Sequence, residues 1–172
     1  MTTAQNKSSK GFTLIELLIV IGILAILLAI TLVALNPARQ FAQSNDTKRR
    51  SDVNAILNAV HQFSADNQGL ISSLNGGAGI PTEAVAGEGC ADANVAPIAG
   101  PTVTNEVDVC ADLVTQYMAA MPVDPQTNNG TPVTDCTAAY TTGYTVISSA
   151  DDQRITVCAP GAEIAAEISV TR

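Results

Sequence analysis

Hydrophobic and polar positions divide this chain of 172 residues into an apolar N-terminal run, an amphipathic stretch and a mixed C-terminal part. The apolar run is uninterrupted over 12–35 and contains one ionisable side chain, Glu16. A helix of these 24 residues is about 36 Å long, which is enough to cross the hydrocarbon of a bilayer. The pattern therefore predicts a membrane-spanning helix. A carboxylate inside such a helix is a functional candidate, because a charge in hydrocarbon is costly.

Helical periodicity continues after Pro37. Apolar residues recur at intervals of three and four, with polar residues between them. These apolar residues are Val53, Ile56, Leu57, Val60 and Phe63. We therefore expect one helix over 12–67, with a bend at Pro37 because proline removes a backbone hydrogen bond. Gly69 supplies a left-handed cap at its end.

The remaining 68–172 are expected to form a globular head. Within it, 69–107 is rich in Gly, Ala, Pro and Thr and predicts a long variable loop. A short helix is expected over 108–121, ended by Pro122. A hairpin is expected with strands at 144–147 and 154–158, an earlier strand at 137–140 is an option, and 164–170 is expected to form either a further strand or a loose tail. The fold class is therefore α+β: a long N-terminal membrane-spanning helix whose C-terminal half packs on a small antiparallel β-sheet.

Charge is unevenly distributed. From 12 to 53 four bases face three acids, whereas from 54 to the end two bases face 13 acids. The head has almost no basic side chains that could neutralise phosphates, so nucleic-acid binding by the head is not expected. The four bases after the apolar run would by themselves place the head in the cytoplasm. The cysteines and the N-terminal leader indicate the opposite orientation.

The head contains an even set of cysteines and none has CxxC or Cys/His metal spacing: Cys90, Cys110, Cys136 and Cys158. This usage predicts two disulfides and an oxidising compartment. Four cysteines allow three pairings. We favour Cys90–Cys110, which closes the variable loop, and Cys136–Cys158, which ties the start of the β region to the end of its hairpin.

The first 11 residues are polar, carry Lys7 and Lys10, and end in Gly11. A secretory signal is cut after its apolar segment, but here the candidate cut precedes it and an uncleaved signal anchor is the alternative. The segment Lys-Gly-Phe-Thr-Leu-Ile-Glu at 10–16, followed by the apolar helix, resembles the class III leader of type IV prepilins and type II secretion pseudopilins. The head is accordingly expected to be pilin-like.

The resemblance implies that prepilin peptidase removes 1–11, cutting between Gly11 and Phe12, and methylates the new amine of Phe12. It also implies that Glu16 acts in assembly. The residues supply a physical reason, since an amine and a carboxylate in hydrocarbon cost less when paired. The pair could form within one helix or between neighbouring subunits. The residues leave both possibilities open, and the resemblance favours the second.

Other chemistry is scarce. His61, the only histidine, has no carboxylate or cysteine at triad spacing, so we expect a surface or packing role and no enzyme. Some major pseudopilins bind calcium near their C-terminal sheet, and this resemblance makes four acids weak Ca²⁺ candidates. They are Asp124, Asp135, Asp151 and Asp152. A solvated acidic loop is the simpler interpretation, and no cofactor is otherwise expected.

Two functions follow from the resemblance. One is a structural subunit of a type IV pilus, a homopolymeric surface filament for adhesion, twitching motility or DNA uptake. The other is a pseudopilin of a type II secretion system. Either implies prepilin peptidase, an inner-membrane assembly platform and minor pilins as partners. The chain would first lie in the inner membrane as a single-pass protein, with its head outside the cytoplasm, and then in an extracellular pilus.

Overall fold

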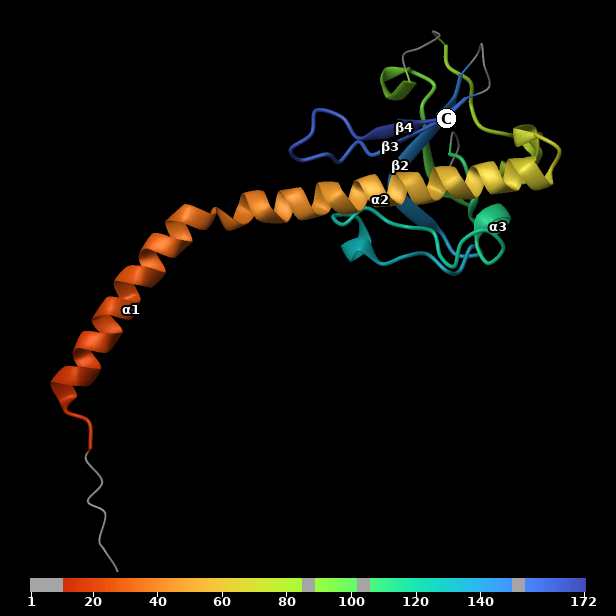
Figure 1. Cartoon of the computed structure of the whole chain (residues 1–172). Helices are drawn as coiled ribbons and strands as arrows, with labels where there is room; N and C mark the ends of the chain where they lie inside the picture. Colours follow the sequence, from red (N-terminus) through yellow and green to blue (C-terminus); the bar gives the residue numbers. More distant parts are fainter. Residues whose placement is uncertain (1–10, 85–88, 102–105, 150–153) are drawn as a thin grey trace, which may run out of the picture. The chain divides into compact units, whose positions relative to one another are not determined.

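The computed structural model describes residues 11–84, 89–101, 106–149 and 154–172 (Figure 1). The chain separates into two compact units, 1–40 and 41–172. In the first, α1 spans Leu14–Leu35. Its aliphatic composition without proline favours a helix, and none of its residues is buried. Among the described residues α1 is the one helix long and apolar enough to cross a membrane.

The second helix, α2, spans Pro37–Asp66. The predicted bend is instead a break at Asn36, whose backbone is left-handed at φ 36° and ψ 77°. A residue before proline avoids the α conformation, and asparagine enters the left-handed region more readily than most residues. Pro37 then takes the first helical position, where its missing N–H is not needed. The predicted C-terminal end is confirmed, because Gly69 has φ +84° and donates to the Ser64 carbonyl at 2.8 Å.

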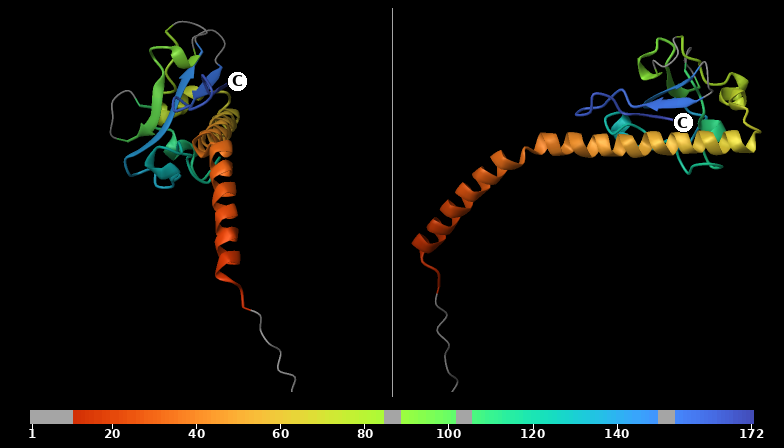
Figure 2. Two further views of the ribbon diagram at one scale, coloured as in Figure 1. Left: turned by 90° about the vertical axis from the view of Figure 1, so that its left-hand side faces the viewer. Right: turned by 45° about the horizontal axis from the view of Figure 1, so that its top comes forward.

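One face of α2 is buried in the head, as the periodicity predicts. The buried apolar residues include Val53, Ile56, Leu57, Val60 and Phe63. They belong to one core with side chains from the sheet, among them Tyr144, Val146, Ile155 and Val157. Figure 2 shows α2 running along the sheet. Each fully buried aliphatic side chain contributes about 1.5–3 kcal/mol relative to exposure, so this face fixes the helix on the head.

The sheet is an antiparallel meander in the order β1-β2-β3-β4. Its strands are β1 (Ala96–Gly100), β2 (Tyr140–Ser148), β3 (Ile155–Cys158) and β4 (Ser169–Thr171). The β2–β3 hairpin is the predicted one, with Val146 opposite Val157. The expected strand at 137–140 is wrong except for Tyr140, where β2 begins, and the last expected strand is shortened to β4. The α+β fold class is confirmed.

The first strand of the sheet lies inside the predicted variable loop. Pro97 and Gly100 concealed it in the sequence, because both residues are rare within strands. The β1–β2 register shifts between Pro97 and Ala99, so the strand accommodates proline at an irregularity. Short 3-10 turns precede β1 at Ile71–Ser73, Asn75–Gly77 and Gly89–Ala91.

The predicted helix over 108–121 is wrong beyond its first turn. The helix α3 covers only Cys110–Leu113. Thr115 then has a left-handed backbone at φ 76°, and its N–H donates to the Met118 carbonyl at 2.8 Å. Leu113 and Met121 are nevertheless fully buried. The apolar spacing therefore marked core positions, while the β-branched pair Val114–Thr115 ended the helix.

The disulfide pairing favoured from the sequence is also wrong. The structure joins Cys90 to Cys158 and Cys110 to Cys136. The turn carrying Cys90 contacts β2 and β3, which brings it to the end of β3, 5.9 Å between the Cα atoms of Cys90 and Cys158. Cys110 begins α3 and faces the segment before β2. Both bridges therefore connect segments that only the folded head brings together.

Candidate functional site

The leader junction immediately precedes α1. Gly11 and Phe12 are exposed, and a Cβ added at Gly11 would meet no atom within 4 Å. Packing of this chain therefore does not require glycine at position 11. Any requirement for a small residue at position 11 must therefore come from another molecule that binds the junction.

Glu16 caps the start of α1. The Thr13 backbone N–H and hydroxyl donate to Glu16 Oε2 at 2.9 and 2.7 Å, and the Glu16 N–H donates to Thr13 Oγ1 at 3.3 Å. These bonds form a capping box, which satisfies N–H groups that have no partner within the helix. The sequence interpretation missed it, although a threonine followed three residues later by a glutamate is its known signal. Among the described residues, Glu16 is hydrogen-bonded by Thr13 and forms no ion pair.

The surface around Glu16 is apolar. A groove of about 470 Å³ beside this carboxylate is lined by Phe12, Leu17, Ile19 and Val20. The remaining large side chains of α1 are likewise exposed. An apolar surface of this extent is a site for lipid or for other apolar helices.

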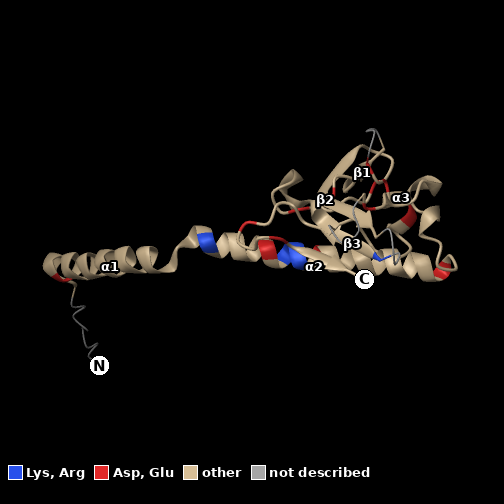
Figure 3. Cartoon of the chain, turned by 90° about the horizontal axis from the view of Figure 1, so that it is seen from above, with Lys and Arg blue, Asp and Glu red and all other residues tan. Residues whose placement is uncertain are grey.

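The head contains an ion cluster that sequence reasoning missed. Arg49, 0% exposed on α2, donates through Nε and Nη2 to Asp124 at 2.6 and 3.1 Å. Its Nη1 donates to Asp46 at 3.0 Å and to Glu163 at 2.8 Å. Figure 3 shows basic and acidic segments side by side in the first half of α2. One guanidinium thus joins α2, the turn at Asp124 and the β3–β4 connection.

Asp46 fixes the β3–β4 connection to α2. Its carboxylate accepts the N–H groups of Glu163, Ile164 and Ala165 at 2.9, 2.9 and 3.0 Å. Burial by itself raises the pKa of Asp46, but these three bonds and the one from Arg49 outweigh burial and hold the pKa well below its usual value. The carboxylate therefore remains ionised and keeps the connection in place.

Asp52, further along α2, has the opposite shift. Burial raises its pKa, and the bond from the Tyr144 hydroxyl, at 2.7 Å, opposes that shift only in part. Burial and the bond to Asp52 in turn raise the pKa of Tyr144 well above its usual value. This pair joins α2 to β2, but its carboxylate is less stable as an anion than Asp46 is.

The calcium candidates do not come together in the described structure. Arg49 occupies both carboxylate oxygens of Asp124, so this residue is no calcium ligand here. Asp135 is exposed and accepts from the hydroxyl and N–H of Thr137, while Asp151 and Asp152 lie outside the described residues. Within 11–84, 89–101, 106–149 and 154–172 there is no group of three or more His, Cys, Asp and Glu that could hold a metal.

His61 lies half-buried on α2. Its Nε2 is buried without a hydrogen-bond partner among the described residues. A catalytic histidine needs a nucleophile or a carboxylate within hydrogen-bond reach, and none of the described hydrogen bonds reaches Nε2. The position is one of packing against the head.

Three features together are typical of a type IV pilin-like protein. They are the leader, the apolar helix, and a head in which a helix packs on an antiparallel sheet. The family model for the prokaryotic N-terminal methylation motif matches residues 6–32. The chain is also 40% identical over 67 residues to the type IV wide pilus major component PilA4 of Thermus thermophilus. That match covers 39% of this chain and 50% of PilA4, so the chain spans about half the length of this curated relative. No solved structure matches the sequence significantly.

The predicted resemblance is thereby confirmed: the chain carries the N-terminal methylation motif of class III prepilin leaders and is similar to a type IV pilus component. The relative is named as a major component of a type IV wide pilus.

Proposed function

We propose that this chain is a structural subunit of a type IV pilus, made as a prepilin and polymerised through α1 into a helical surface filament that serves adhesion, twitching motility or DNA uptake. One observation carries the proposal. The methylation motif at 6–32 leads into a helix with no buried residue. Such a helix needs lipid before assembly and neighbouring helices afterwards, because its apolar surface would otherwise face water.

Processing is the first step of this function. Prepilin peptidase cuts between Gly11 and Phe12, removes 1–11 and methylates the amine of Phe12. Exposure of the junction and the absence of any packing demand for glycine at position 11 support a role for Gly11 in recognition by the peptidase. The residues 12–35 then form the filament core and 68–172 the head.

Glu16 directs assembly. After cleavage the amine of Phe12 is cationic, and in an apolar environment it is stabilised by a carboxylate. Glu16 of a subunit already in the filament accepts the Phe12 amine of the incoming one, which sets the axial register. The apolar surface beside Glu16, to which Phe12 contributes, supports this role because a neighbouring apolar helix packed on it would exclude water from the pair.

The partners and location follow from the same role. Before assembly the chain lies in the inner membrane as a single-pass protein with its head outside the cytoplasm. The two disulfides of the head support this orientation. The inner-membrane platform and minor pilins then incorporate it into an extracellular pilus. A type II secretion pseudopilin is the second candidate, because leader, helix and head would serve either filament.

Two measurements test this function. In a strain lacking the gene, surface fibres are imaged and secretion of exoproteins is measured in parallel. Loss of fibres with normal secretion supports the pilus subunit, and the reverse result supports the pseudopilin. In the complemented strain, mass spectrometry of the mature chain should find an N-terminus at Phe12 with one added methyl group, and Gly11→Val should keep the uncut chain in the membrane. Fibres that retain Met1 would contradict the processing step.

A further inference from the structure

Among the described residues of the unit 41–172, three large apolar side chains are strongly exposed: Phe41 at 70%, Leu70 at 58% and Ile164 at 46%. Ile164 is unusual because its backbone is rigidly held. The N–H of Ile164 and those of both its neighbours donate to the buried Asp46 carboxylate. Arg49, itself fully buried, adds a bond to Glu163 at 2.8 Å.

The anchoring of this segment has a consequence for binding. A loop that is already ordered loses little conformational entropy when it binds, so an apolar side chain on it contributes more of its burial energy to affinity. Small residues, Ala162, Ala165 and Ala166, surround Ile164 in the sequence. They leave Ile164 as the one large apolar side chain of 162–166, an exposed knob that lines a pocket together with Gln43 and Arg50 of α2.

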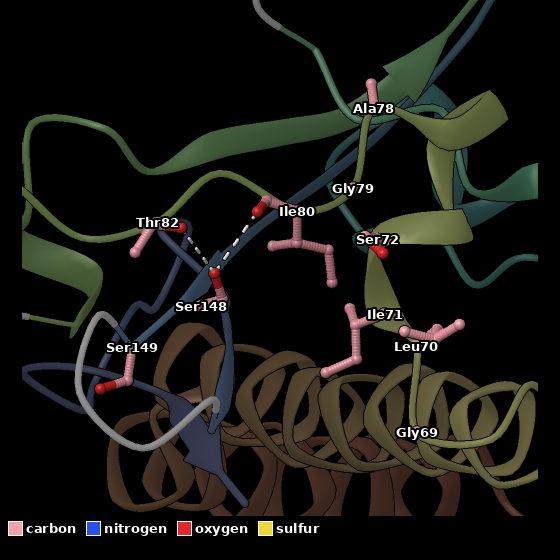
Figure 4. A pocket seen from close by; sticks show the side chains of 10 residues that line it. All are labelled: Gly69, Leu70, Ile71, Ser72, Ala78, Gly79, Ile80, Thr82, Ser148 and Ser149. Atoms are coloured by element: carbon pink, nitrogen blue, oxygen red, sulfur yellow. Dashed lines mark hydrogen bonds between the residues drawn. The ribbon is translucent and has the colours of Figure 1, made fainter.

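A groove of about 390 Å³ lies at the other end of the unit (Figure 4). Leu70, Ile71 and Ile80 provide its apolar side chains, and Gly79 a stretch of bare backbone. The Ser148 hydroxyl in its wall donates to the carbonyls of Ile80 and Pro81 at 3.4 and 3.0 Å. The Ser148 hydroxyl is therefore already paired within the wall, and the groove combines apolar side chains with hydroxyl groups, with Leu70 at an exposed position.

The knob and the groove cannot meet within one molecule. Asp46 holds the knob near the start of α2, whereas the groove begins just after α2 ends at Asp66. Twenty residues of helix separate these two aspartates, a distance of about 30 Å. Figures 1 and 2 both show the β3–β4 connection toward the start of α2 and the segment after α2 at its far end. Any partner for the knob must therefore be another molecule.

Charge at the two ends is complementary. Lys48 and Arg50 are exposed on the part of α2 where Asp46 holds the knob segment, and Asp66 is exposed at the groove end. Figure 3 shows blue segments together with red in the first half of α2 and red at its far end. A second copy approaching end to end would thus place bases opposite an acid, which favours this orientation over its reverse.

We infer that Ile164 of one subunit inserts into the groove formed by Leu70, Ile71 and Ile80 of a second copy. The contact joins head to head, and it rests on the proposed function, in which copies polymerise through α1. It is heterologous, since each copy offers a knob at one end and a groove at the other. Contacts of this kind continue into an open helical filament when the rotation does not close.

Photo-crosslinking of assembled fibres tests the contact directly. The full chain carries the photoreactive amino acid p-benzoylphenylalanine in place of Ile164, and in a matched control in place of the exposed Gln62 on α2. After irradiation of the fibres, the crosslink from position 164 should map to 69–80 of a second copy, and that from position 62 should not. A crosslink from position 164 to any other segment overturns the inference.

A charge exchange tests it a second way. Ile164→Glu and Leu70→Lys should each lower the yield of shear-resistant fibres by about tenfold, the effect of truncating an interface anchor. The two together should restore most of it, and Ile164→Val should leave the yield near that of the parent. Disulfide mapping and protease resistance of each full chain verify folding.

The outcomes separate the two proposals. Fibres of Ile164→Glu at the parental yield would overturn the head contact and leave the pilus function in place. A parent chain that forms no filament of any kind would overturn both.

Discussion

The helices α1 and α2 each carry a charged side chain on an apolar face, but the compensation of that charge differs. Arg49 of α2 is fully buried and contacts three carboxylates of its own chain within 3.1 Å. Glu16 of α1 is hydrogen-bonded by Thr13, while its surroundings are apolar. A buried charge must be paired. The comparison teaches that the buried charge of α2 is compensated by its own chain, whereas the exposed Glu16 of α1 has only Thr13 as a hydrogen-bond partner among the described residues, which agrees with the proposed pairing between subunits.

The two helices also differ in how much of their apolar surface is buried by their own chain. The second helix buries one face in the core of the head, and α1 buries nothing in its unit. Substitutions in α2 should therefore change the free energy of unfolding of the monomer. Substitutions in α1 should change assembly and leave the fold of the head intact.

Glu16 tests this difference with the largest expected effect. Glu16→Val should abolish fibres while membrane level and head stability stay unchanged, because it removes the charge pair between subunits together with the capping box, which lies at the start of α1 and outside the head. Glu16→Gln is the matched control, since glutamine also serves in a capping box but has no charge. Both variants should fail equally by electron microscopy of surface fibres. Normal fibres from Glu16→Gln would show that the cap, and not the charge, is what assembly needs.

Arg49 tests the opposite side of the comparison. Arg49→Met should lower the free energy of unfolding by about 3–5 kcal/mol, because it leaves buried carboxylates without their cation. Arg49→Lys should lose less, as lysine keeps the charge without the two-pronged geometry. Denaturant unfolding of the full chain in detergent, followed by far-UV circular dichroism, measures both. A loss below about 1 kcal/mol for Arg49→Met would show that water or protonation compensates the cluster.

The sequence predicted the features that repeat along one helix. Residues 12–35 and the buried face of α2 were recognisable because helical periodicity is local. The position of Arg49 was also visible in principle, since it lies four and seven residues before the buried Val53 and Ile56. A base on the apolar stripe of a helix indicates a buried ion pair, and this signal was overlooked.

Features that depend on distant segments could not be predicted. Asp124 and Glu163 reach Arg49 across separations of 75 and 114 residues, and no local pattern links them. The same holds for the bridge from Cys90 to Cys158, 68 residues apart. The sequence interpretation preferred short loops, although a longer loop loses more entropy when it is closed in the unfolded chain.

Asp46 should have a smaller and pH-dependent effect. Asp46→Asn should cost about 2 kcal/mol at pH 7, because an amide accepts the N–H groups of the knob segment more weakly than a carboxylate does. The folded-state pKa lies below the usual 3.8. The stability from Asp46 is therefore present above pH 3.8 and is lost as the pH falls through the folded-state pKa. Unfolding free energies of parent and variant between pH 2 and 7 check this, and a constant difference down to pH 2 would contradict it.

Asp52 should show the smallest effect, with the opposite sign. Its pKa is raised above the usual 3.8, so its contribution to stability is complete below pH 3.8 and disappears as the pH rises through the folded-state pKa. At pH 7 the half-buried Asp52 anion slightly lowers the free energy of unfolding. Asp52→Asn keeps an acceptor for the Tyr144 hydroxyl and should gain about 0.5 kcal/mol at pH 7, with no gain at pH 3. A loss at pH 7 as large as that of Asp46→Asn would mean that the two aspartates stabilise α2 in the same way, and that burial does not set the difference between them.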